Sequence, residues 1–194
     1  SDVYKRQGKS LLLKWEGEDL TLDPILLTGH YDVVPVRANA NEIWKEKPFS
    51  GKIDSDYVWG RGALDDKSGV IAIMEAVGYL IKNDFSPKRT VYLSFGHDEE
   101  IGGRRGAAKV TEYLIGKGIN LEWTLDEGSF LLENIIPGVN KAVAVINVAE
   151  KGSLTIQVIG KSKGGHSSMP ESNSSVGYLA EALIKLEENP LPGK

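Results

Sequence analysis

Four short polar clusters recur along the chain, and three of them contain adjacent acidic residues. They are GHYD at 29–32, GALDD at 62–66, HDEE at 97–100 and LDEG at 125–128. The first, third and fourth each follow a short apolar run that is typical of a buried strand. Carboxylates and an imidazole gathered at one edge of a sheet are costly unless positive charge lies among them. A pair of divalent metal ions would supply that charge, so the clusters favour a metal-dependent enzyme.

The composition of the chain limits both its size class and the kind of metal site that it can build. With 194 residues it is long enough for one domain and part of a second. A net charge of −4 argues against nucleic acid as a partner. No apolar run approaches the ~20 residues that a membrane helix needs, so no membrane partner is expected. The chain has no cysteine, so any metal must be held by histidine, aspartate and glutamate.

Alternating short strands and helices in the first three-quarters of the chain predict an α/β fold. Strands are expected at 11–15, 24–28, 90–95 and 123–125, helices at 67–82 and 105–115, and a hairpin at 49–59. This order is typical of a mainly parallel sheet with helices on both faces. Sites in such sheets form at the carboxyl ends of the strands, where His30, Glu99 and Glu127 are expected.

The pattern changes near residue 150, where we expect a second domain to begin. Alternating strands are predicted at 142–149 and 154–159, followed by a glycine-rich loop around His166 and a helix at about 175–188. One domain is therefore expected over 8–149, and the start of an α+β domain over 150–194. Residues 1–7 have no signal-peptide pattern and are interpreted as a non-native leader. Because the chain also stops in a loop, it is interpreted as a fragment truncated at both ends.

Two of the clusters combine residue types that can bind and orient a metal ion. His30 and Asp32 are two residues apart, so on an extended chain they point the same way, and Asp32 can accept the second ring N–H of His30. Asp65 and Asp66 precede a helix, where one aspartate can cap the N-terminus and the other is free to bridge two metal ions. For the first cluster taken alone, a capped turn is the more common explanation, and for the second a helix cap is an equally ordinary one.

The adjacent pair Glu99 and Glu100 is the more diagnostic feature. A metal-dependent hydrolase needs one carboxylate on the metal and a second that accepts a proton from the attacking water. One carboxylate cannot easily do both, because coordination lowers its basicity. Adjacent glutamates that leave a strand diverge, so one can bind the metal while the other faces the substrate. His97 lies beside the pair, but its spacing is expected to turn it aside.

Taken together, the motifs resemble the M20 family of zinc metallopeptidases. The likeness is carried by TGHYDVVP at 28–35, WGRGALDDK at 59–67, DEEIGG at 98–103 and DEG at 126–128. EKGS at 150–153 and GHSS at 165–168 are most similar to the carboxypeptidase S and PM20D1-like branch. The resemblance implies a zinc-peptidase-like catalytic domain over 8–149, of which this chain holds the N-terminal part. It also implies that a ferredoxin-like lid and dimerisation domain begins at 150.

The resemblance also implies the metal ligands of a site that holds two zinc ions when complete. His30 would bind one zinc, Asp65 would bridge both, and Glu100 would bind the second. Either Asp126 or Glu127 would complete the zinc on His30, and Glu127 is the preferred choice.

Three further roles follow from the same resemblance. Glu99 would be the general base, and Asp32 would orient the metal-binding histidine. His166 resembles the histidine that reaches across a homodimer, formed through the lid, to the carboxylate or developing oxyanion of the substrate. The expected substrate is a small peptide or an N-acyl amino acid.

The family closes its second zinc site with a histidine that follows the lid, and none of His30, His97 and His166 occupies that place. The expected activity of the parent protein is hydrolysis of an amide bond next to a C-terminal amino acid, with this chain alone inactive. The alternatives are an aminoacylase that acts on N-acyl amino acids, a dipeptidase, or a non-catalytic dimerising binding protein on the same fold. The intact glutamate pair argues against a binding protein, and the compartment, cytoplasmic or secreted, stays open.

Overall fold

The computed structural model describes residues 3–6, 9–37, 44–128, 131–134, 136–150, 152–166, 168–169 and 174–190. The chain divides into two compact units, Ser1–Ile146 and Asn147–Lys194. The predicted metal ligands all belong to the first unit, so the candidate centre can be built from that unit alone.

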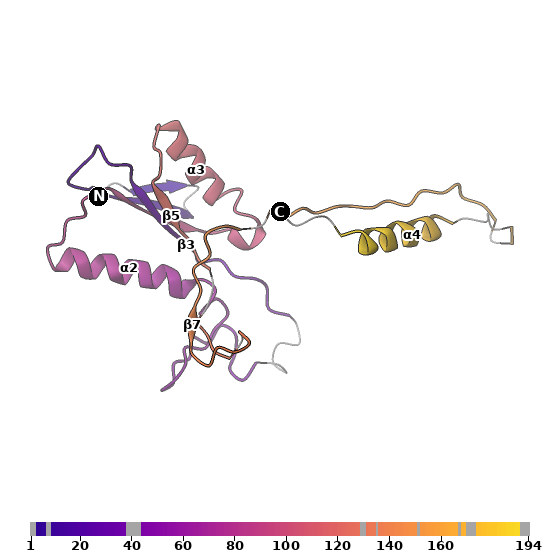
Figure 1. Cartoon of the computed structure of the whole chain (residues 1–194), viewed down its shortest axis with the longest axis horizontal. Coiled ribbons are helices and arrows are strands. Elements are labelled where there is room, and N and C mark those ends of the chain that lie inside the picture. Colours follow the sequence, from indigo (N-terminus) through magenta and orange to yellow (C-terminus); the bar gives the residue numbers. More distant parts are fainter. Residues whose placement is uncertain are drawn as a thin grey trace. The chain divides into compact units, whose positions relative to one another are not determined.

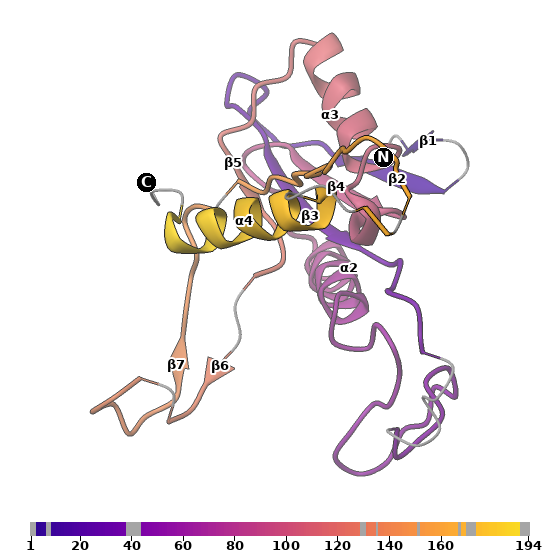
Figure 2. The ribbon, with the colours of Figure 1, turned by 90° about the vertical axis from the view of Figure 1, so that its right-hand side faces the viewer.

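The first unit contains a five-stranded sheet (Figure 1), and its strands, labelled in Figure 2, follow the order β1-β2-β4-β3-β5. Its strands are β1 (Val3–Arg6), β2 (Ser10–Trp15), β3 (Ile25–His30), β4 (Val91–Gly96) and β5 (Trp123–Leu125). The four predicted strands are confirmed, with boundaries that differ by at most two residues. Residues 3–6, within the segment interpreted as a leader, form the edge strand β1.

The half of the sheet that carries the site is parallel. Strand β3 pairs in parallel with both β4 and β5, whereas β2 pairs antiparallel with β4 and β1 antiparallel with β2. The sheet is therefore mixed, with its antiparallel pairs at the β1 side. His30 at the end of β3 lies opposite Gly96 at the end of β4. Because the carboxyl ends of parallel strands share one edge, the segments that follow β3, β4 and β5 are brought together.

Helices α2 (Lys67–Lys82) and α3 (Ala107–Gly116) cover opposite faces of the sheet, as predicted (Figures 1 and 2). Successive strand residues point to opposite faces, so each helix packs on its own apolar cluster. The cluster beneath α3 contains Leu12, Tyr92, Val110 and Leu114. The cluster beneath α2 contains Val91, Leu93 and Phe95, against which Val70, Ile73 and Val77 of the helix pack.

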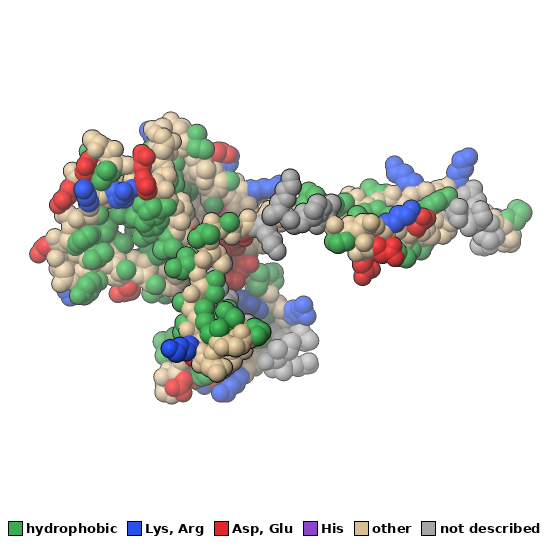
Figure 3. Space-filling view, in the orientation of Figure 1, with side chains coloured by type: hydrophobic (Ala, Val, Ile, Leu, Met, Phe, Trp, Pro, Cys, Tyr) green, Lys and Arg blue, Asp and Glu red, His purple; other side chains and the backbone are tan. Residues whose placement is uncertain are grey.

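Helix α2 spans the predicted residues, but only part of its apolar stripe reaches the sheet. Val70, Ile73 and Val77 pack against the sheet, whereas Met74 and Ile81 are more than half exposed. Hydrophobic side chains are accordingly visible on the surface of this unit (Figure 3). The contact follows an i, i+3, i+7 row of the helix, and apolar residues flanking that row remain in solvent.

The predicted hairpin over 49–59 is confirmed, since Ile53 and Val58 form an antiparallel bridge. Its tip is closed by Asp54, whose Oδ1 accepts the backbone N–H groups of Asp56 at 3.0 Å and Tyr57 at 2.9 Å. An aspartate that bonds the backbone two residues further on is a common way to make such a turn.

The strands predicted at 142–149 and 154–159 are largely wrong. Within the described residues of these two segments, Val143–Ala144 (β7) alone forms a strand, and it pairs with Leu131–Leu132 (β6) in a separate two-stranded sheet (Figure 2). A strand is stable when a neighbouring strand pairs its backbone N–H and C=O groups. Alternating hydrophobicity identifies a chain that can pair, but it does not supply the partner.

In the second unit, helix α4 (Ser175–Glu188) confirms the helix predicted at about 175–188. Ser174 caps it, because its hydroxyl accepts the backbone N–H of Gly177 at 3.1 Å. A ferredoxin-like lid is not confirmed by this helix and stays a prediction. Among the described residues, no helix has the length and apolar character needed to cross a membrane.

The packing of α3 on the sheet can be tested with two adjacent leucine-sized residues. Leu114 is buried in the cluster beneath α3, whereas Ile115 on the same helix is 70% exposed. We expect Leu114→Ala to lower the free energy of unfolding of the 194-residue chain by about 2–4 kcal/mol. Ile115→Ala should change it by less than about 0.5 kcal/mol. Urea denaturation followed by circular dichroism measures both, and equal effects would contradict the packing described here.

Candidate metal centre

His30 is the residue around which the polar clusters gather. It is the last residue of β3 and is only 2% exposed, because the apolar part of the strand carries it into the core. Its Nδ1 lies 3.1 Å from the backbone carbonyl oxygen of Asp32 and can donate to it. When Nδ1 carries the proton, Nε2 carries the lone pair and is free to bind a cation.

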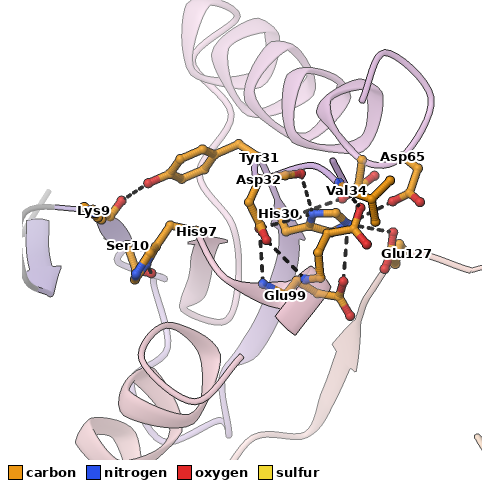
Figure 4. A network of polar contacts seen from close by, with 12 residues as sticks. Lys9, Ser10, His30, Tyr31, Asp32, Val34, Asp65, His97, Glu99 and Glu127 are labelled. Atoms are coloured by element: carbon orange, nitrogen blue, oxygen red, sulfur yellow. Dashed lines mark hydrogen bonds and ion pairs between the residues drawn. The ribbon is translucent and has the colours of Figure 1, made fainter. Parts of the chain in front are cut away.

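Three carboxylates face Nε2 of His30 (Figure 4). The Oδ1 of Asp65 is 3.0 Å away, the Oε2 of Glu127 is 3.4 Å away, and the Oε2 of Glu99 is 3.8 Å away. These residues come from the segment before α2, from the end of β5 and from the end of β4. The predicted convergence at the carboxyl ends of the strands is therefore found in the structure.

Asp32 connects the ring of His30 to the loop after β4. Its Oδ1 is 3.4 Å from Nδ1 of His30. The same carboxylate accepts the backbone N–H of Glu99 through Oδ1 and that of Glu100 through Oδ2, both at 3.1 Å. One side chain thus faces the imidazole and holds the turn that carries the adjacent glutamates.

The two adjacent aspartates have different environments. The side chain of Asp65 is 64% exposed and points at His30, whereas Asp66 is 6% exposed. The Oδ2 of Asp66 accepts the backbone N–H of His30 at 3.2 Å. A Cβ on Gly29 would lie 2.6 Å from that oxygen, so glycine leaves the space that the buried carboxylate occupies. The bond between the two aspartates is a cis peptide.

The adjacent pairs Glu99–Glu100 and Asp126–Glu127 each separate in space. Glu99 faces His30, while Oε1 of Glu100 accepts the backbone N–H of Val34 at 3.2 Å. Glu127 faces His30, while Oδ1 of Asp126 accepts the backbone N–H of Glu127 at 2.9 Å. Of the second pair, Glu127 is therefore the residue that the geometry brings to the imidazole.

The electrostatics of the cluster reflect its excess of negative charge. The pKa of Glu127 is raised to about 6, chiefly by burial; His30 opposes this shift, and the charges of Asp65, Asp66 and Glu99 add to it. Burial also raises the pKa of Glu99, again with help from neighbouring carboxylates. For His30, burial lowers the pKa, but the surrounding carboxylates outweigh this effect and the net pKa is raised. In all three shifts the neighbouring carboxylates act in the direction expected from an excess of negative charge.

The donor set of this cluster fits a divalent metal ion. His30, Asp65 and Glu127 each offer one ligand atom, and the three atoms lie within 4.8 Å of one another. A histidine nitrogen with two carboxylate oxygens is a set that zinc accepts, and three protein ligands leave a fourth position open. The Asp32 contact on Nδ1 is the usual outer partner of a metal-binding histidine. The geometry is thus compatible with zinc.

The other two histidines lie elsewhere. His97 turns aside as predicted, with its Nδ1 2.6 Å from the Oγ of Ser10. His166 belongs to the second unit, where its Nδ1 lies 2.8 Å from the Oγ of Ser168 and accepts the N–H of that residue at 3.3 Å. Sequence reasoning did not identify Ser10, and it did not decide which aspartate would be buried. A serine at the first position of an apolar strand has no spacing signal, because its partner is 87 residues away.

Known proteins are similar in sequence to this chain over most of its length. A probable carboxypeptidase S-like 2 from Dictyostelium discoideum is 46% identical over 183 residues, which is 93% of this chain and 35% of that protein. An N-fatty-acyl-amino acid synthase/hydrolase PM20D1 from Xenopus tropicalis is 43% identical over 185 residues, 95% of this chain and 36% of that protein. Carboxypeptidase S from Saccharomyces cerevisiae is 41% identical over 187 residues, 93% of this chain and 31% of that protein. The chain thus spans about a third of the length of these relatives.

Solved structures share the fold. An M20 family metallo-carboxypeptidase from Sulfolobus solfataricus matches with a TM-score of 0.53 and 28% identity, over 67% of this chain and 28% of that one. Human carnosine dipeptidase 1 matches with a TM-score of 0.54 and 20% identity, over 64% of this chain and 26% of that one. At that identity the second likeness concerns the fold alone.

The part of the chain that matches a protein-family model includes the residues that form the centre. The model of peptidase family M20/M25/M40 matches residues 26–191, from β3 to just beyond α4. This range contains every side chain that faces Nε2 of His30. The chain therefore belongs to peptidase family M20/M25/M40.

Proposed function

We propose that the protein containing this chain is a zinc-dependent hydrolase of the amide bond next to a C-terminal amino acid, of the carboxypeptidase or dipeptidase type. The observation that carries this proposal is the convergence of Asp65 and Glu127 on Nε2 of His30, with Asp32 on the opposite side of the ring. Family membership and relatives named as carboxypeptidases support it.

In this proposal His30, Asp65 and Glu127 would hold the first zinc ion, and Asp65 and Glu100 would contribute to the second. The second carboxylate oxygen of Asp65 makes it suited to a bridging role. Zinc in these positions supplies a Lewis acid that polarises the amide carbonyl and makes water more acidic. Because the chain offers three ligands to the first ion and two to the second, we expect the first to bind more tightly.

Glu99 is the proposed general base. It is the most distant of the three acids that face His30, at 3.8 Å, so it can remain unbound when the nearer two coordinate. The turn that carries it is held by the Asp32 carboxylate. From this position Glu99 accepts a proton from the attacking water at its carboxylate and later donates it to the leaving amine.

Residues 150–194 are proposed to begin a lid and dimerisation domain that presents His166 to the substrate. The Nδ1 of His166 accepts the N–H of Ser168, so a neutral ring carries its proton on Nε2. An N–H donor in that position suits the substrate carboxylate or the developing oxyanion.

A second candidate function is hydrolysis of N-acyl amino acids. It is favoured by the relative from Xenopus tropicalis named an N-fatty-acyl-amino acid synthase/hydrolase, whose identity of 43% is close to the 46% of the carboxypeptidase S-like protein. Both reactions cleave an amide bond beside a free amino-acid carboxylate. The same metal centre therefore serves either substrate.

The choice between Asp126 and Glu127 as a ligand gives a matched test of the first zinc site. Because Glu127 faces His30 and Asp126 does not, Glu127→Gln should weaken zinc binding to the 194-residue chain by more than about 100-fold. Asp126→Asn should change it by less than about threefold, since its side chain bonds a backbone N–H. Competition with a chromophoric chelator measures both constants. Strong loss in Asp126→Asn alone would reverse the assignment.

The proposed base is tested in the full-length protein that contains this chain. Glu99→Gln keeps the size of the side chain but cannot accept the proton, so kcat should fall by about 10³-fold or more, in line with the usual contribution of a general base. Zinc content, measured by atomic emission, should stay unchanged. Loss of zinc from this variant would instead make Glu99 a ligand, and Glu100→Gln provides the comparison because it should lose the second ion.

Side-by-side rates separate the two substrate classes. The full-length protein is expected to hydrolyse Gly-Leu-type dipeptides with a higher kcat/KM than acetyl or long-chain acyl amino acids. The reverse order would favour the second candidate function. The 194-residue chain alone is expected to hydrolyse none of them, because its second site has two ligands, and clear turnover by the purified chain would contradict this.

A further inference from the structure

The segment at the start of β2 lies behind the candidate metal centre and contacts both loops that carry it. Leu11 of β2 pairs with Phe95 of β4, so Lys9 and Ser10 lie beside the point where β4 ends and the HDEE cluster begins. Figure 4 shows one contact from this segment to His97 and another to Tyr31.

The first contact ties β2 to the loop after β4. The Oγ of Ser10 lies 2.6 Å from Nδ1 of His97, and Ser10 is 1% exposed. His97 directly follows the last residue of β4 and stands two residues before Glu99. This partly buried hydrogen bond limits how far the loop can move, because breaking it would leave the buried Ser10 hydroxyl without a partner.

The second contact ties β2 to the loop after β3. The hydroxyl of Tyr31 donates to the backbone carbonyl of Lys9, and Tyr31 stands between His30 and Asp32 in the chain. Its ring packs against the apolar cluster beneath α2. Because β4 lies between β2 and β3 in the sheet, the Tyr31 side chain spans the end of β4.

The corner occupied by Ser10 is closely packed. The Oδ2 of buried Asp98 accepts the backbone N–H of Arg105 at 2.7 Å. A Cβ on Gly106 would lie 2.4 Å from Oδ1 of Asp98 and 2.8 Å from Oγ of Ser10. No side chain fits at residue 106 without displacing these groups, so the loop after β4 has little freedom at its base.

A continuous set of contacts leads from this corner to the metal-binding nitrogen. The loop that His97 anchors presents the N–H groups of Glu99 and Glu100 to the Asp32 carboxylate, which faces Nδ1 of His30. A shift of the loop would therefore move Asp32, and with it the direction of the His30 lone pair. Orienting partners of this kind influence metal affinity although they do not touch the metal.

The geometry points to Ser10, His97 and Tyr31 as positioning residues that hold His30, Asp32 and Glu99 in register for metal binding. We call these three residues and the Lys9 carbonyl the strand-end clamp. The inference rests on the proposed function, in that the group being positioned is a metal site. It assigns to His97 a role that is neither metal ligation nor acid–base chemistry.

The test compares Ser10→Ala, Tyr31→Phe and His97→Ala in the 194-residue chain. Each change removes one clamp contact, and Tyr31→Phe keeps the packing of the ring. Each variant is expected to bind zinc about three- to tenfold more weakly, somewhat less than the 10- to 100-fold typical of a partner that touches the ligand directly. The visible absorption of bound Co²⁺, which reports ligand geometry, should change as well. Amide hydrogen exchange at Glu99 and Glu100 should accelerate by about tenfold even without metal.

Two matched variants separate positioning from general loss of stability. Thr90 lies just before β4, at the opposite end from the clamp, and its buried Oγ1 accepts the N–H of Gly17 at 3.2 Å. Thr90→Val should lower the melting temperature about as much as the clamp variants do. It should leave zinc affinity and hydrogen exchange at Glu99 unchanged. His97→Asn places an amide atom close to the position of Nδ1, so it should restore much of what His97→Ala loses.

The results distinguish the clamp from the metal site itself. Unchanged zinc affinity, Co²⁺ absorption and exchange in all three clamp variants would overturn the inference, as would equal changes in Thr90→Val. If the unmodified chain bound neither zinc nor Co²⁺, the proposed function would fail. The exchange rates of Glu99 and Glu100 would still decide whether the clamp holds the loop.

Discussion

The organisation of this molecule depends on the attraction between one buried imidazole and the carboxylates that surround it. Asp65, Glu127 and Glu99 all approach Nε2 of His30 within 4 Å. Like charges at such separations repel, and burial increases the cost of each. The raised pKa of Glu127, about 6, is a direct expression of that cost. An arrangement of this kind is stable when a cation shares the space, and it is this requirement that makes the cluster a candidate metal centre.

The parallel part of the sheet brings His30 and the acidic residues together. Strand β3 is flanked by β4 and β5 in parallel, so the loops that follow the three strands emerge at one edge. Asp32 then links two of these loops through the N–H groups of Glu99 and Glu100. Asp66, from the segment before α2, fixes the end of β3 by accepting the backbone N–H of His30. The acidic residues therefore divide into those that face the metal position and those that hold its frame.

Features set by local sequence, and the meeting of the strand ends, were predicted well, whereas several contacts between distant residues were not. Helix α4 and helix α2 match the predicted ranges because apolar periodicity is a local signal, although the aspartate expected to cap α2 makes no side-chain cap hydrogen bond. The strand expected at 154–159 does not form, because a strand needs a partner that its own sequence does not specify. Likewise, Asp65 and Asp66 are adjacent and chemically identical, and the buried carboxylate of Asp66 occupies space that a side chain on distant Gly29 would fill. The contact between Ser10 and His97 joins residues with no shared pattern.

The chemistry of amide hydrolysis and the choice of substrate depend on different parts of such a protein. A carboxypeptidase and an N-acyl amino acid hydrolase both act on an amide bond beside a free carboxylate, so the electrostatic task at His30 and Glu99 is the same for both. The centre described here cannot by itself favour one over the other, since nothing in that task depends on the acyl side of the substrate. Selectivity must come from groups that contact the acyl side chain, and such groups are typically carried by loops rather than by strand ends. A centre at the strand ends, where Asp32 joins the loops after β3 and β4, leaves other loops free to carry that selectivity.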